Sequence, residues 1–293
     1  MRLFKKCLFH LCLISYFFHF SGILPPDNYV VSQKIYTPYL TVKFLNVGQG
    51  DSIIIQFPNG KCLLMDGGPR ESSEAVLNGL IELGIQKIDY LICTHPDIDH
   101  IGGLLDVVRS VPVGQVYDSG KGYDTRAYLE YIRLIHERNI PFSIIQEGDV
   151  LPFDSEVTVQ VLNSGQGKIF NNHAGIVLWV KYKACEFLFT ADVEKHIEKR
   201  LIRKYLLDVD VLKVAHHGSK SSTSKAFLEK IRPSYAVLSY EKGNPYGHPH
   251  RSVLKRLKQN KVQWFETARD GDIDMKTDGY RLWIEGEKMS VKR

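Results

Sequence analysis

Two segments of the chain, 117 residues apart, carry almost the same ten residues. Residues 41–50 read TVKFLNVGQG and residues 158–167 read TVQVLNSGQG, so seven of the ten positions are identical. In each half the apolar stretches that follow end in an aspartate, Asp66 in the first and Asp192 in the second. Two copies of one supersecondary unit are expected to pack sheet against sheet, with their strand ends at a shared cleft. Chance similarity is the alternative, because ten residues are few.

The rest of the body alternates between strand-like and helix-like patterns. Residues 40–57 predict two strands around a Gly-Gln-Gly turn, and the pair Asn59-Gly60 predicts a type I′ hairpin. Residues 74–83 have the spacing of a helix, and residues 88–94 predict a short buried strand. This alternation predicts an α/β fold in which helices cover sheets.

The net charge excludes one class of protein. The chain has 38 Lys and Arg residues against 33 Asp and Glu residues, a surplus of five. Three of the positive charges lie in the first six residues and residues 1–24 contain no acid, so the surplus from residue 25 onward is only two. A strongly basic, histone-like nucleic-acid binder is therefore excluded, whereas a nuclease that needs only a local basic strip is compatible with the sequence.

Residues 1–24 have the pattern of a signal peptide or an N-terminal membrane anchor. A short basic start precedes residues 7–24, which carry no charge, and two prolines follow. Such a stretch is a marginal span for a bilayer about 30 Å thick, so cleavage and anchoring both stay open. A buried hydrophobic helix is the weaker alternative. We expect export, with residues 25–39 as a linker and residues 40–293 as an extracytoplasmic domain.

Four potential metal ligands lie within six residues of one loop. The segment THPDIDHIGG follows the buried strand and contains His95, Asp97, Asp99 and His100. These groups would repel one another beside an apolar strand unless cations lay between them, although a polar turn with capping aspartates is the alternative. The first two can point one way and the last two another, which suits two metals. The following Gly102-Gly103 pair allows a close approach of backbones.

Three later segments add further candidates. Asp192 ends an apolar strand, where it can bridge two metals or cap the helix that follows. The adjacent pair His216-His217 also follows an apolar strand, and only one of the two can easily face the metals. His248 lies in the rigid segment YGHPH, for which a surface turn is a nearly equal interpretation.

Together these motifs resemble the metallo-β-lactamase superfamily, and more narrowly the hydrolase domain of ComEC-type DNA-uptake proteins. The matching stretches span the body from about residue 40 to residue 285: FLNVGQGDSIII, LLMDGG, THPDIDHIGG, FLFTADVE, LKVAHHGSKSS and YGHPH. The resemblance implies an αββα four-layer sandwich with two similar halves and a dinuclear hydrolytic centre. No second stretch approaches about 20 apolar residues, so we expect a free-standing hydrolase module behind a leader, without the channel of the full uptake protein.

The sequence departs from the family pattern at three places, of which FTAD in place of the more usual TGD leaves Asp192 unchanged. Asp97 replaces the middle histidine of HxHxDH, and the added carboxylate makes Mn²⁺ a competitor of Zn²⁺. The third ligand motif is not clear, but His173 of the segment Asn171-Asn172-His173 is a candidate ligand or substrate neighbour. We therefore expect two divalent ions, Zn²⁺ or Mn²⁺.

We hypothesise a role for each candidate. Asp66 would accept a hydrogen bond from a ligand imidazole, and His248 would protonate the leaving group or bind phosphate. A phosphate cradle would consist of Ser219, Lys220, Ser221 and the helix N-terminus after them, although a solvated capping region is an equal interpretation. Asp99 is expected to serve as both ligand and catalytic residue. Two cations about 3.5–4 Å apart would be held by His95, Asp97, Asp99, His100, Asp192 and one of His216 and His217.

The resemblance favours a phosphodiester substrate, with DNA first, cut outside the membrane in the context of competence and a DNA-uptake machinery. A phosphodiesterase for a small or cell-wall-linked phosphoester is the first alternative. A β-lactam-opening enzyme is less favoured, because Asp97 and the HHGS pattern belong to another branch of the family. A catalytically silent binding module is the last alternative, and the intact ligand set argues against it.

Overall fold

The computed structural model describes residues 38–165 and 175–286. The chain divides into two compact units, residues 1–33 and 34–293, and the first lies outside the described residues. The expected leader and nearly all of the expected linker therefore lie outside them too. Within the described part, no helix is both long and apolar enough to cross a membrane.

Eight strands form the first sheet. They are β1 (Leu40–Phe44), β2 (Ile53–Gln56), β3 (Cys62–Met65), β4 (Ile88–Ile92), β5 (Val113–Asp118), β6 (Phe142–Ile144), β14 (Ile273–Thr277) and β15 (Leu282–Gly286). Their order in the sheet is β15-β14-β1-β2-β3-β4-β5-β6. From β15 to β3 all neighbours are antiparallel, and from β3 to β6 they are parallel.

Seven strands form the second sheet and repeat the topology of the first. They are β7 (Val150–Leu151), β8 (Val157–Asn163), β9 (Val177–Tyr182), β10 (Cys185–Phe189), β11 (Val211–Lys213), β12 (Tyr235–Leu238) and β13 (Gln263–Glu266), paired in chain order. Three antiparallel pairings precede three parallel ones, as they do from β14 to β6. The repeated sequence segments run through β1 and β8, which hold equivalent places. The two similar halves expected from the repeat are therefore present.

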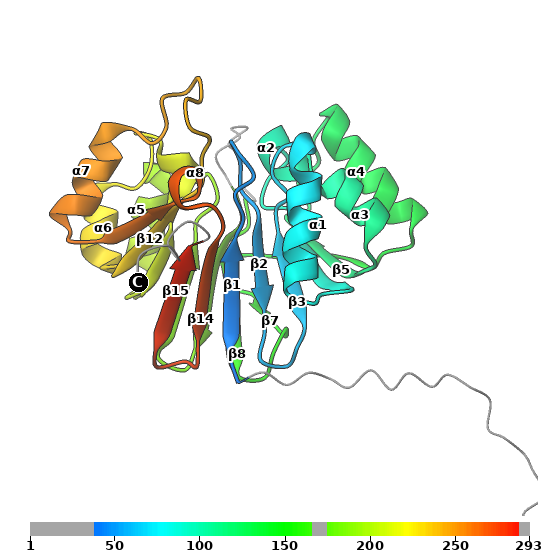
Figure 1. The fold of residues 1–293 in the computed structure, drawn as a ribbon, viewed down its shortest axis with the longest axis horizontal. Helices are drawn as coiled ribbons and strands as arrows, with labels where there is room; N and C mark the ends of the chain where they lie inside the picture. Colours follow the sequence, from blue (N-terminus) through cyan, green and yellow to red (C-terminus); the bar gives the residue numbers. More distant parts are fainter. Residues whose placement is uncertain (1–37, 166–174, 287–293) are drawn as a thin grey trace, which may run out of the picture. The chain divides into compact units, whose positions relative to one another are not determined.

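Helices cover the outer face of each sheet and complete four layers (Figure 1). Parallel neighbouring strands need crossover connections, and these connections contain the helices other than α8 (Thr267–Asp270), which lies between β13 and β14 in the chain. The first half holds α1 (Ser73–Glu82), α2 (Ile98–Ile101), α3 (Leu104–Ser110), α4 (Arg126–Glu137) and the 3-10 helix η1 (Arg70–Ser72). The remainder holds α5 (Lys195–Lys204), α6 (Lys225–Ile231), α7 (Arg251–Gln259), α8 (Thr267–Asp270) and the 3-10 helix η2 (Ala215–Gly218). A core around Phe44, Phe153 and Phe187 joins the two sheets, which is the expected αββα sandwich.

The turn between β2 and β3 differs from the prediction. A type I′ turn needs a positive φ at both central residues, but only Gly60 of the pair Asn59-Gly60 has one, at 79°. The amide of Gly60 donates to the carbonyl of Phe57, and the amide of Phe57 donates to the carbonyl of Lys61. This is a type I turn followed by a glycine bulge, so the predicted hairpin is present and its predicted turn type is wrong.

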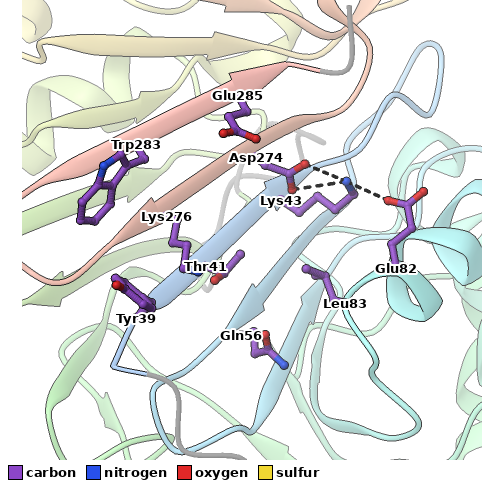
Figure 2. A pocket seen from close by; sticks show the side chains of 10 residues that line it. All are labelled: Tyr39, Thr41, Lys43, Gln56, Glu82, Leu83, Asp274, Lys276, Trp283 and Glu285. Atoms are coloured by element: carbon purple, nitrogen blue, oxygen red, sulfur yellow. Dashed lines mark hydrogen bonds and ion pairs between the residues drawn. The ribbon is translucent and has the colours of Figure 1, made fainter. Parts of the chain in front are cut away.

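The outer face of the first sheet carries a cavity of about 850 Å³ beside α1 (Figure 2). Lys43 lines it, and its ammonium lies 3.0 Å from Asp274, 3.1 Å from Glu82 and 3.4 Å from Asp272. Burial alone would lower the pKa of Lys43, but these carboxylates outweigh burial and raise the pKa. The charge of Lys43 is thus balanced within the sheet face. The cavity shares no residue with the candidate metal ligands.

Candidate metal centre

Loops after equivalent strands of the two halves bring the candidate ligands together. Asp66 follows β3 and Asp192 follows β10, while His95 follows β4 and the His216-His217 pair follows β11. Strands β3 and β10, and likewise β4 and β11, hold equivalent places in their sheets. Each half therefore contributes an aspartate and at least one histidine to one cluster.

The carboxylate of Asp192 lies at the centre of this cluster. Its oxygens lie within 4 Å of four imidazole Nε2 atoms: His100 at 3.5 Å, His217 at 3.6 Å, His216 at 3.7 Å and His95 at 3.8 Å. Asp192 is not the N-cap of α5, which is Glu194. Both adjacent histidines adopt a left-handed backbone with φ of 51° and approach Asp192. Among the described residues, His217 and not His216 belongs to groups of acid and imidazole side chains compact enough to hold a metal ion, so the choice of one ligand from the pair stays a prediction.

The two other acids of the metal loop approach different histidines. An oxygen of Asp99 lies 3.3 Å from Nε2 of His217, and an oxygen of Asp97 lies 3.7 Å from Nε2 of His95. Both acids are partly exposed, whereas both histidines are buried. The carboxylates of the loop therefore reach two sides of the cluster, which is compatible with two metal positions.

The donor atoms of this cluster fit divalent cations. The Nε2 atoms of His95, His100 and His217 are buried and have no hydrogen-bond partner among the described residues. In contrast, the Nδ1 of His217 lies 2.9 Å from the carbonyl of Ser239, and the Nδ1 of His95 lies 3.1 Å from the hydroxyl of Thr94. Converging imidazole nitrogens and carboxylate oxygens are the ligands that zinc takes, and the additional carboxylates suit manganese.

Asp66 orients the imidazole of His100. One of its oxygens lies 2.9 Å from Nδ1 of His100 and also accepts the hydroxyl of Thr94 at 2.7 Å. Its other oxygen accepts the backbone amide of Thr94 at 2.7 Å. This is the hydrogen bond that the sequence predicts between Asp66 and an imidazole of the candidate ligand set. It assigns the proton to Nδ1 and leaves Nε2 facing Asp192.

Burial and neighbouring acids separate the pKa values of the histidines. Burial lowers the pKa of His95 to about 4, and the positive charge of His100 acts in the same direction. Burial alone would lower the pKa of His217, but Asp192 and Asp51 outweigh it and raise that pKa to about 10. Burial alone would raise the pKa of Asp192, but His217 and His100 lower it well below its usual value.

Metal uptake is expected to release protons. Without a cation, the raised pKa of His217 stabilises the folded chain fully below about pH 6.5, and this contribution is lost as the pH rises through about 10. A cation requires the neutral imidazole, so at pH 7 it must displace the proton, and metal affinity should rise with pH across this window. Calorimetric titration with Zn²⁺ in buffers of different ionisation heat measures the release. Equal heats in all buffers would contradict the expectation, and His217→Gln should release fewer protons.

Asp51 and Lys213 form a buried ion pair that the sequence interpretation missed. Their charged atoms lie 2.7 Å apart, and the side chains are 3% and 0% exposed. A carboxylate oxygen of Asp51 also lies 3.5 Å from Nδ1 of His217, and the backbone amide of Asp51 donates to the carbonyl of Asp99. Burial alone would raise the pKa of Asp51, but Lys213 and His217 lower it. Both residues lie inside the motifs GQGDS and LKVAHHG, and this was the available signal.

The loop that carries His248 lies against the histidine cluster. The His248 ring is 5.6 Å from that of His216 and 6.4 Å from that of His217. Asn244 fixes the loop, because its amide donates to the carbonyl of His248 at 2.7 Å and its carbonyl accepts the amide of His248 at 3.0 Å. Burial lowers the pKa of His248 to about 4, helped by His216, so the ring is neutral at pH 7. A neutral ring suits phosphate binding through its N–H better than protonation of a leaving group.

The side chains of the expected phosphate cradle lie close to a buried carboxylate. Ser219 and Ser221 face each other with hydroxyls 3.1 Å apart, and Lys220 is exposed beside them. Directly before α6, the buried carboxylate of Glu198 accepts the amides of Thr223 and Ser224. This carboxylate is therefore a neighbour of the helix N-terminus in the predicted cradle, whose role stays a prediction. The roles of the three cradle side chains stay predictions, and His173 lies outside the described residues.

A family comparison decides the relationship that the geometry suggests. The model of the metallo-β-lactamase superfamily matches residues 45–241. The chain belongs to the metallo-β-lactamase superfamily. It is 30% identical to ComE operon protein 3 of Bacillus subtilis over 252 residues, which are 79% of this chain and 32% of that protein. It is 32% identical to Recombination protein 2 of Haemophilus influenzae over 273 residues, 91% of this chain and 32% of the other.

Solved metallo-β-lactamase-fold structures agree with the architecture. A diphosphatase of the PhnP family covers 84% of this chain and all of its own, with a TM-score of 0.51 and 17% identity. Zn²⁺-bound PqqB from Methylobacterium extorquens covers 77% of this chain and 97% of its own, with a TM-score of 0.54 and 11% identity. These likenesses show the fold alone. The chain spans about a third of the length of its two curated relatives.

Glycines let the loops of this metallo-β-lactamase fold approach one another at the centre. A Cβ on Gly103 would lie 2.1 Å from the carbonyl oxygen of Gly67, and one on Gly102 would lie 2.6 Å from the amide nitrogen of Arg70. A Cβ on Gly50 would lie 2.3 Å from the carbonyl oxygen of Asp99. The close approach predicted for Gly102-Gly103 is therefore confirmed. The absence of a side chain at these glycines lets the loop of residues 94–103 pack closely against the loop that carries Asp66.

Gly103→Ala is expected to destabilise the fold by about 1–3 kcal/mol, because the added methyl meets rigid backbone. Gly103 has φ of −69°, so the effect is steric and not conformational. Gly122→Ala is the matched control, since no atom lies within 4 Å of its Cβ position. Chemical denaturation of both variants measures the difference. An equal midpoint for the two would show that the loops can separate freely.

Four residues of the centre adopt the left-handed backbone that non-glycine residues rarely use. Asp66 has φ of 59° and Ala191 has φ of 43°, and both histidines of the 216–217 pair have φ of 51°. Such conformations are strained and concentrate at functional sites of proteins. In this metallo-β-lactamase fold they aim the side chains at the ends of β3, β10 and β11 toward one point.

Proposed function

We propose that this chain is a dinuclear metal-dependent phosphodiesterase that cleaves DNA. The observation that carries the proposal is the buried convergence of imidazole Nε2 atoms on Asp192, with Asp97 and Asp99 at its rim. Six residues would hold the cations: His95, Asp97, Asp99, His100, Asp192 and His217. Bound divalent cations supply Lewis-acid chemistry and lower the pKa of coordinated water.

The residues of the chain prepare the site for a phosphodiester. Asp66 keeps the Nε2 of His100 directed inward, and Asp51 with Lys213 supports the His217 side of the cluster. The neutral ring of His248 would donate an N–H to a phosphate oxygen. Ser219 and Lys220 closely follow the His216-His217 pair in the sequence. These groups bind and orient, so a phosphodiester rather than a lactam is the substrate they suit.

The choice of DNA rests on the relatives. Two of them are named Recombination protein 2 and Competence protein ComA, the latter from Neisseria gonorrhoeae and 28% identical over 78% of this chain. In this proposal the domain acts outside the membrane, exported or anchored through residues 1–24, beside a DNA-uptake machinery. Protease digestion of intact cells tests that location, and protection of the domain would contradict it.

The activity is tested with the full-length chain, stripped of metal and reloaded with Zn²⁺ or Mn²⁺. Single-stranded DNA, double-stranded DNA and bis-p-nitrophenyl phosphate are offered to each form, with Asp99→Asn as the inactive variant. Asp208→Asn is the matched control, because Asp208 is exposed and pairs only with Arg232 among the ion pairs of the described residues. Metal-dependent DNA cleavage that disappears only in Asp99→Asn supports the proposal. Cleavage of the small ester alone would replace DNA by a small phosphoester, and no cleavage of any substrate would overturn the proposal.

A further inference from the structure

The positive charge of the chain is concentrated in the helical layer of the second sheet. Residues 195–261, from the start of α5 to just past α7, contain sixteen Lys and Arg residues against five Asp and Glu residues. This segment therefore has a surplus of eleven positive charges, although the whole chain has a surplus of only five. The rest of the chain is net acidic. The segment that contains α5, α6 and α7 is therefore basic, whereas the remaining residues taken together are acidic.

Most of this charge is exposed and not balanced by acids. Fourteen of the sixteen basic side chains are exposed, against three exposed acids in the same segment. On α5, Lys195, Lys199 and Arg203 recur every four residues, and none of them forms an ion pair among the described residues. Like charges at this spacing destabilise a helix. An unbalanced stripe of this kind indicates an anionic partner.

A second stripe follows α7. Arg251, Lys255 and Lys258 recur at intervals of four and three residues on its exposed side, again without an ion pair in the described part of the chain. Helix α6 lies between the two stripes, because β11 and β12 lie between β10 and β13 and each crossover adds one helix. Figure 1 shows α5, α6 and α7 together on the side of the molecule away from α1, α3 and α4. We call the exposed basic side chains of these three helices the basic face.

The basic face begins at the metal centre. Helix α5 starts three residues after Asp192, and α7 starts directly after His250, whose ring contacts that of His248 at 5.1 Å. The ammonium of Lys195 donates to the carbonyl of Lys220, which is next to the cradle residue Ser219. A long anion on the basic face can therefore continue into the cluster.

The apolar content of the face distinguishes a nucleic acid from a membrane. A helix that lies on a bilayer carries large apolar side chains beside its basic ones. In residues 195–261 the large exposed apolar side chains are Leu206, beyond the end of α5, and Tyr246. The Tyr246 ring is 62% exposed and 5.7 Å from that of His248. An exposed aromatic ring beside basic groups is the usual platform for an unstacked base.

We propose that the basic face binds the phosphate backbone of a nucleic acid and leads the strand past Tyr246 to the metal centre. The inference rests on the proposed function for the identity of the substrate, but its binding step is independent of cleavage. The inference predicts that a bound nucleic acid contacts the chain along α5, α6 and α7 as well as at the scissile phosphate.

Charge reversal on the basic face tests the proposal. Lys199→Glu/Arg203→Glu on α5 and Lys255→Glu/Lys258→Glu on α7 are combined in the full-length chain with Asp99→Asn, which prevents cleavage. Binding of labelled single-stranded and double-stranded DNA is measured between about 50 and about 200 mM salt. We expect affinity to fall at least tenfold and the salt slope to decrease by about 0.7–0.9 for each phosphate that the variant no longer neutralises. Arg126→Glu/Arg133→Glu on α4 is the matched control and should change affinity less than twofold.

A second readout separates this inference from the proposed function. With Asp99 intact, the same charge reversals should leave the hydrolysis of bis-p-nitrophenyl phosphate unchanged, because a small ester does not reach the helices. Equal DNA affinity in all variants would overturn the basic face while ester cleavage still supported the enzyme. DNA binding that depends on the face, without cleavage of any ester, would retain the face and reject the enzyme. Binding to anionic phospholipid vesicles instead of DNA would overturn the inference in favour of a membrane.

Discussion

Asp192→Asn is expected to abolish high-affinity metal binding and to lower phosphodiester hydrolysis at least about 10³-fold. The carboxylate of Asp192 is the group that approaches His95, His100, His216 and His217 together, all within 4 Å. An amide has nearly the same shape but no charge to hold a cation or an imidazolium. Metal content after dialysis and the rate on bis-p-nitrophenyl phosphate measure the two effects separately.

Asp208→Asn is the matched control for this loss, since Asp208 lies on the surface and contacts Arg232. It should keep both metal and rate. Metal retained at full occupancy by Asp192→Asn would contradict the central place given to this carboxylate. Loss of metal with an unchanged rate would contradict the requirement of the reaction for metal.

Lys213→Met is expected to destabilise the folded chain by about 3–5 kcal/mol, because it leaves the carboxylate of Asp51 buried without its partner. The two charged groups lie 2.7 Å apart and are almost fully buried. Lys181→Met, on β9 of the same sheet, is the matched control. Lys181 pairs with Glu186 at the same distance but is 40% exposed, so its loss should change stability by about 0–1 kcal/mol.

The double variant Asp51→Asn/Lys213→Met distinguishes the loss of an attraction from an uncompensated charge. It removes both charges, so most of the stability that Lys213→Met removes should return. Denaturant unfolding of the metal-free protein measures the cycle without interference from bound cations. If the double variant were as unstable as the single one, the pair would contribute through its net attraction and not through the burial of Asp51.

The sequence was informative wherever a function or fold leaves a local pattern. The repeat in residues 41–50 and 158–167 predicted two similar halves, and β1 and β8 occupy equivalent strands. The segment THPDIDHIGG predicted clustered ligands, and Gly102-Gly103 predicted the close approach of its loop. Each of these signals is carried by segments of about ten consecutive residues, the repeat by two such segments.

Features that depend on distant residues were not predictable. Asp51 and Lys213 are 162 positions apart, and the motifs GQGDS and LKVAHHG that contain them do not indicate that the two side chains pair with each other. The carboxylate that accepts the amides of Thr223 and Ser224, directly before α6, comes from Glu198 of α5. The left-handed backbone of the His216-His217 pair is rare for residues other than glycine, and residue type alone does not predict it.

The equivalence of the two sheets has a consequence for assembly of the chain. The loop ligands of the first half and the strand-end ligands of the second are separated by more than about ninety residues, so neither half alone completes the cluster. A cation bound at the proposed centre would act as a cross-link that closes a very long loop, and its loss would loosen both halves at once. Two fragments divided between β6 and β7 would therefore need each other to regain metal affinity, as two subunits of a dimer do.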